Sequence, residues 1–248
     1  MAGVSVSAER AVRWTAPLAM FVREYYRTTL NLVLLVVIPA LVIFAVSDSL
    51  GRISQVFATG LTTDMAESMG ALWAAAFLTG MMGFFMITGA RGADRRLVRA
   101  GYRPLQIVVF RFAVIAIFGG LATAASYLLL LTRLTPIDHV QMLLVMYLAA
   151  LLYGALGVLI GSLVPGELEG SFALLFFFVM DAFIASPLFG DPTGVGLNLL
   201  PTFYPTKVLL YVTAGQPHDS VHWLYIGAYA AVVGTLAAIA FHRAAARG

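Results

Sequence analysis

The sequence predicts an all-α polytopic membrane protein with six transmembrane helices, and three observations support this fold class. Of the 248 residues, 61% are hydrophobic and 11% are charged, whereas soluble domains are about half apolar and a quarter charged. Six apolar runs of 17 to 25 residues are long enough to cross a bilayer core, which takes roughly 20 helical residues. These runs lack the polar–apolar alternation of membrane β-strands.

The predicted spans form one transmembrane domain over residues 1–248. The first span is the shortest and contains Pro39, and the first, second, fourth and sixth spans contain no charged residue. The spans are residues 30–46, 69–90, 107–131, 142–164, 170–189 and 223–241.

The segment before the first span, residues 1–29, is predicted to be an amphipathic interfacial helix. Trp14, Leu18, Phe21 and Tyr25 recur at the spacing of one helical face. Such a helix lies along the membrane surface with its aromatic side chains among the lipid headgroups. It serves either as a lipid anchor or as a docking surface for a partner.

The orientation follows from the basic residues, which are fourteen arginines and one lysine. Twelve arginines fall before the first span, around the second-to-third connection and after the sixth span; Arg52, Arg133 and Lys207 fall on the other side. The positive-inside rule therefore predicts that both termini are cytoplasmic. Arg111, near the start of the third span, is expected to reach the inner headgroups.

The second-to-third connection, residues 91–104, is predicted to contain a separate short helix. Asp94 suits an N-cap, Gly101 suits a helix stop, and Pro104 prevents continuation. The segment is either a docking site or a topology signal alone.

Two other connections carry local signals. Glu167 and Glu169 precede the fifth span, where they either cap its helix or contact a basic partner surface. The segment from Pro205 to Gly215 is apolar but too short to cross a bilayer. We expect it to form a short re-entrant or interfacial helix packed on the bundle.

Asp181 is the one acidic residue deep in a predicted span. A carboxylate at the bilayer centre costs about 3 kcal/mol on insertion scales, so it needs protein or water around it. Asp181 is either a structural polar group or part of a transport path, and Lys207 is one candidate partner.

The fourth span contains Gly154, Gly157 and Gly161. The spacing of the last two permits close helix approach. The contact is either within the chain or with a second subunit.

The sequence predicts no catalytic or metal site. Cysteine is absent, the four histidines lie at or outside span ends, and Lys207 follows Pro205-Thr206 rather than the glycine of a nucleotide-binding P-loop. We therefore expect a protein that is not an enzyme. The net charge of +3 fits membrane topology and anionic lipid, and it does not indicate nucleic acid.

The architecture resembles that of the membrane subunits of type-2 ABC exporters. The features concerned are six spans, an amphipathic helix before the first span, a proline-containing apolar segment before the sixth, and the motif Asp94-Arg95-Arg96-Leu97-x-x-Ala100-Gly101-x-x-Pro104. The resemblance implies that a coupling helix and the N-terminal helix contact an ATPase. The positions carried over are Asp94, Arg95, Arg96, Leu97, Arg99, Arg23, Glu24 and Arg27.

The same resemblance implies two permease subunits, identical or different, with two copies of an ABC ATPase subunit. ATP and Mg²⁺ would then bind to the ATPase and no cofactor to this chain. The expected function is outward movement of a hydrophobic or amphipathic compound, such as a drug or a lipid, across a bacterial inner membrane. The alternative is a small integral-membrane structural or assembly factor that does not transport.

Overall fold

The computed structural model describes residues 60–99, 104–187 and 196–246, together with eight separate positions between 37 and 52. Every regular element from residue 60 onward within these ranges is a helix, so the all-α prediction is confirmed for this part of the chain. The predicted N-terminal helix over 1–29 lies outside the described residues, as does most of the predicted first span over 30–46.

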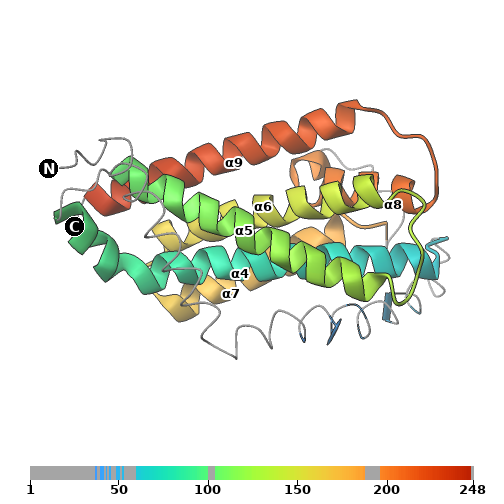
Figure 1. The fold of residues 1–248 in the computed structure, drawn as a ribbon, viewed down its shortest axis with the longest axis horizontal. Helices are drawn as coiled ribbons and strands as arrows, with labels where there is room; N and C mark the ends of the chain where they lie inside the picture. Colours follow the sequence, from blue (N-terminus) through green and yellow to red (C-terminus); the bar gives the residue numbers. More distant parts are fainter. Residues whose placement is uncertain are drawn as a thin grey trace, which may run out of the picture.

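Six α-helices and one 3-10 helix make up the described ranges from residue 60 onward (Figure 1). They are α4 (Thr63–Arg99), α5 (Pro104–Leu130), α6 (His139–Leu163), α7 (Glu167–Ile184), η2 (Leu197–Leu199), α8 (Phe203–Thr213) and α9 (Val221–Ala246). Four of them, α4, α5, α6 and α9, are long and apolar enough to cross a membrane.

Local chemistry explains several helix ends. Pro104 is the first residue of α5, a position where its missing N–H costs nothing. Asp138 caps α6 by accepting a 2.9 Å hydrogen bond from the backbone N–H of Gln141. The same helix stops at Leu163, two residues before Pro165. These ends lie within a few residues of the predicted span boundaries.

Helix α7 is shorter than the predicted fifth span, which ran to residue 189. It has 18 residues and ends at Ile184, before Ser186 and Pro187. The hydroxyl of Ser186 donates to the carbonyl of Phe183 at 2.7 Å, and this local bond competes with helix continuation. At 1.5 Å per residue, α7 is about 27 Å long.

Helices α4, α6 and α9 run in one direction along the bundle, and α5 and α7 run in the opposite direction (Figure 1). At one end, Ile87 of α4 packs with Ile107 of α5 and Phe241 of α9. At the other end, the hydroxyl oxygens of Thr213 of α8 and Ser68 of α4 are hydrogen-bonded, 3.1 Å apart. We refer to these as the Arg99 end and the α8 end. The two ends separate the connections that the sequence assigns to opposite sides of the membrane.

The centre of the bundle is a close crossing of α4 and α6. A Cβ on Gly157 would overlap the backbone oxygen of Gly80, and one on Gly83 would overlap that of Gly154. Gly161 lies against Phe84, where an added Cβ would be 3.1 Å from the carbonyl oxygen. The glycines of the fourth predicted span therefore pack within the chain, because only residues without side chains let the two backbones approach so closely.

The short helix predicted between Pro205 and Gly215 is present as α8. Pro205, Val208, Leu209 and Val212 are buried, so the helix packs on the bundle through one apolar face. Gly215, with a φ of 64°, ends the segment in a left-handed conformation that favours glycine.

Candidate functional site

A buried polar junction joins α6, α7 and the start of α8. The hydroxyl of Tyr153 donates to the Asp181 carboxylate. The backbone N–H of Thr202 donates to both carboxylate oxygens, at 3.1 and 3.2 Å, and its hydroxyl donates to the Asp181 carbonyl at 3.3 Å. Asp181 is 1% exposed, and these donors replace the water that a buried carboxylate loses.

The partner proposed from the sequence for Asp181 was wrong. No ion pair links Lys207 to Asp181; instead, its ammonium group lies over the ring of Phe203, 5.9 Å from the centroid. Tyr153 and Thr202 were not singled out. One signal was available, because a tyrosine inside an otherwise uncharged span needs a hydrogen-bond partner for its hydroxyl.

A cavity of about 440 Å³ lies at the α8 end. One of its lining residues, Phe203, directly follows Thr202 of the polar junction in the sequence. Two adjacent stripes of α8 line one wall: Phe203, Lys207 and Tyr211 on one, and Thr206, Leu210 and Ala214 on the other. Residues four apart share a helical face, so the sequence of α8 alone accounts for both stripes.

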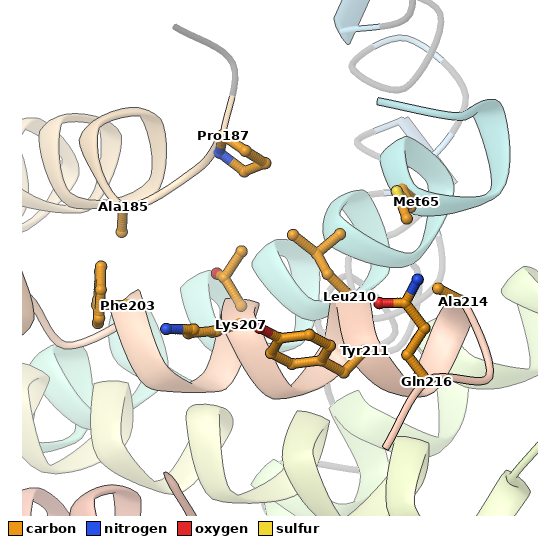
Figure 2. Close-up of a pocket in the computed structure, with 10 residues that line it drawn as sticks. Met65, Ala185, Pro187, Phe203, Lys207, Leu210, Tyr211, Ala214 and Gln216 are labelled. Carbon is orange, nitrogen blue, oxygen red and sulfur yellow. The ribbon is translucent and has the colours of Figure 1, made fainter. Parts of the chain in front are cut away.

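The opposite wall comes from other elements. Met65 of α4 lies on one side, and Ala185 and Pro187, just after α7, lie on the other (Figure 2). Gln216 closes the pocket beyond the C-terminal end of α8. Because Thr202 precedes α8 and bonds to Asp181, the polar junction fixes where α8, and hence this wall, begins.

Aromatic rings connect α8 to the first turns of α9. Tyr204 stacks on Tyr225 with ring centroids 4.7 Å apart, and the Tyr211 and His222 rings are 6.3 Å apart. The indole N–H of Trp223 donates to Nε2 of His218 at 2.9 Å. His218 and His222 thus pack with the aromatic rings that hold α9 against α8.

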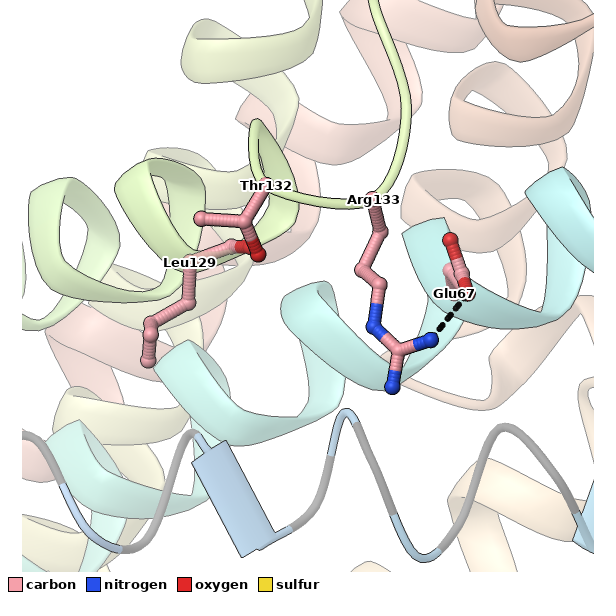
Figure 3. Close-up of polar contacts among 4 residues, drawn as sticks. All are labelled: Glu67, Leu129, Thr132 and Arg133. Atoms are coloured by element: carbon pink, nitrogen blue, oxygen red, sulfur yellow. Dashed lines mark hydrogen bonds and ion pairs between the residues drawn. The ribbon is translucent and has the colours of Figure 1, made fainter.

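An ion pair also lies at the α8 end. Arg133, after α5, lies 3.9 Å from the Glu67 carboxylate of α4 (Figure 3). Glu67 is 6% exposed and was not singled out in the sequence, since it precedes the predicted second span. The pair ties the α5–α6 connection to the first turns of α4.

At the Arg99 end, the structure corrects the predicted separate helix over 94–100. Helix α4 runs without a break from Thr63 to Arg99, so Asp94 lies in the helix interior and is not an N-cap. The arginine, alanine and leucine residues of this stretch all favour helix, and Arg99 is the last described residue of the helix. The backbone at Arg95, Arg96, Leu97 and Arg99 is therefore a continuation of the membrane helix.

Three other residues singled out from the sequence lie at the Arg99 end, and three more lie outside the described residues. Glu167 and Glu169 lie exposed in the first turn of α7, where a negative charge suits the helix dipole. Arg111 is 2% exposed, so the expectation that it reaches the headgroups was wrong, and protein encloses it. Arg23, Glu24 and Arg27 lie outside the described residues.

Comparison with known proteins adds no assignment: no family model matches the chain, and no curated protein matches it.

Proposed function

We propose that this chain is the permease subunit of a type-2 ABC exporter in a bacterial inner membrane. It would have six spans and cytoplasmic termini. It would pair with a second permease subunit and with two ATPase subunits that bind ATP and Mg²⁺. Closure of the ATPases would move the paired bundles between two arrangements, and a hydrophobic or amphipathic compound would leave the cell.

One observation carries this proposal. The uncharged apolar run of α4 ends at Ala90 in the sequence, and the same helix continues to Arg99. Nine further residues extend the helix by about 14 Å. This extension contains Arg91, Arg95, Arg96 and Arg99 in sequence. A continuous helix transmits displacement directly to the glycine crossing, where α4 meets α6.

The alternation of the helices supports the same proposal. The end of α4, the start of α5, the α6–α7 connection and the end of α9 lie together at the Arg99 end (Figure 1). Most of the arginines of the described residues belong to this end in sequence. A partner bound on the cytoplasmic side would thus meet several connections at once.

The test is affinity purification of the tagged chain from its native membranes, with identification of bound proteins and measurement of ATPase activity. We expect an ATPase to co-purify with wild type and to be lost with Arg95→Glu combined with Arg96→Glu, because like charges at an interface repel. The matched control is Arg95→Lys with Arg96→Lys, which keeps both positive charges at the same positions and should retain the ATPase.

Two results would contradict the proposal. Native purification without any ATPase would favour the alternative, an assembly factor without transport. If the ATPase is recovered equally with both double variants, the α4 extension is not a docking site and acts only as a topology signal.

A further inference from the structure

The pocket at the α8 end has the composition of a binding site. Its volume of about 440 Å³ lies within the range of small-molecule sites, which are mostly apolar with a few polar groups. The apolar walls come from Met65, Ala185, Pro187, Phe203, Leu210 and Ala214.

The pocket holds the only lysine of the chain. Lys207 is half-buried among the lining residues. Its ammonium group is positioned against the Phe203 ring, and no carboxylate in the described residues pairs with it. A half-buried ammonium group beside apolar walls attracts an anion more than a fully solvated one does, because the effective dielectric constant there is lower than that of water.

A second observation points to a ligand. Thr206 is 1% exposed and lines the pocket, yet its Oγ1 has no hydrogen-bond partner. Buried hydroxyl groups are nearly always bonded, and in helices threonine commonly bonds to the carbonyl four residues earlier. Thr213, in the same helix, makes that bond to the carbonyl of Leu209 at 2.8 Å. The Thr206 hydroxyl is therefore available as a hydrogen-bond donor, and Thr206 directly precedes Lys207 in the sequence.

From these observations we propose that the pocket binds a single-chain anionic amphiphile. The anionic oxygens would pair with Lys207 and accept from Thr206, and the hydrocarbon chain would lie along Leu210, Phe203 and Met65. The site does not need an ATPase, so it goes beyond the proposed function and can be tested apart from it.

The experiment measures equilibrium binding of radiolabelled dodecanoate to the full chain in phosphatidylcholine nanodiscs, with empty nanodiscs subtracted. We expect saturable binding at one site. Dodecanol should compete at least tenfold more weakly than unlabelled dodecanoate, and dodecyltrimethylammonium should not compete.

The variants test the two polar groups. Lys207→Met keeps the aliphatic stem and should weaken binding at least tenfold, Lys207→Arg should restore most of it, and Thr206→Val should weaken it several-fold. Arg52→Met, which removes an exposed cation that does not line the pocket, should bind as wild type does. Unchanged thermal unfolding of the Lys207 variants would show that binding, and not folding, was altered.

A separate experiment identifies the source of the ligand. Mass spectrometry of lipid extracts from protein purified in its native membrane would show a stoichiometric anionic amphiphile, lost in Lys207→Met, if a membrane lipid occupies the pocket. An empty native preparation that still binds added dodecanoate would indicate a free amphiphile. Non-saturable binding, or equal affinity in wild type and Lys207→Met, would overturn the proposal.

Discussion

The hydroxyl of Tyr153 on α6 donates a hydrogen bond to the carboxylate of Asp181 on α7, and both side chains are almost fully buried. Because Thr202 donates to the same carboxylate, the junction fixes the position of α8 relative to two longer helices. Asp181 does not line the adjacent pocket. These contacts favour the structural interpretation of Asp181 over a role in a transport path.

We expect Tyr153→Phe and Asp181→Asn each to lower the free energy of unfolding by about 1–3 kcal/mol. Tyr153→Phe removes one donor to the buried carboxylate, and Asp181→Asn replaces one acceptor oxygen with an NH2 group that faces the Tyr153 and Thr202 donors. The double variant should lose less than the sum of the two, since residues in direct contact couple. Chemical unfolding of the purified protein in detergent measures all four species. Transport per folded molecule should stay at the wild-type level.

Additive losses would show that Tyr153 and Asp181 act independently. Normal stability together with altered transport in Asp181→Asn would place the carboxylate in the path instead.

The glycine crossing gives a second prediction. Gly157→Ala should destabilise the protein by about 1–3 kcal/mol, because the new methyl group would overlap the backbone of α4 at Gly80 and overpacking separates the helices. Gly227→Ala is the matched control, since an added Cβ there meets nothing within 4 Å. That variant should be neutral or stabilised by up to about 1 kcal/mol from helix propensity. Unfolding in detergent compares the two, and equal effects would refute the steric explanation.

The sequence predicts the helices well because their signals are local. Long apolar runs, Pro104 and Gly215 mark ends that the structure places within a few residues. The partners in the site depend on tertiary packing and were missed. Thr202 is 21 residues from Asp181, and Tyr153 is 28 residues away; no local pattern brings them together.

Two local signals were also misleading. Asp94 has the chemistry of an N-cap, yet it lies inside α4, because helix-forming residues on both sides propagate the existing helix. Arg111 has the long side chain expected to reach headgroups, yet it is buried in the bundle. In both cases neighbouring structure outweighed a single-residue preference.

The third prediction concerns topology. The twelve arginines assigned to one side and the three basic residues assigned to the other should place both termini in the cytoplasm. Reporter fusions should alternate between outside and inside, beginning outside, when placed after Ser49, Ala100, Thr135, Gly166, Gly215 and Arg247. Two neighbouring fusions that report the same side would refute the six-span topology.

The last prediction uses the continuity of α4 to test how the extension acts. Gly89 lies next to Ala90, where the uncharged apolar run of α4 ends, and a Cβ added at Gly89 meets nothing within 4 Å. Gly89→Pro should break the helix at this point, because proline removes a backbone hydrogen bond and costs about 3 kcal/mol in a helix interior. The variant should still bind the ATPase, whereas ATP-driven export should fall at least tenfold. Gly89→Ala keeps the helix and should retain both properties.

Co-purification and export assays in the same membranes measure the two properties separately. Equal export by the two variants would mean that an unbroken α4 is not needed, and the extension would then act only as a docking site.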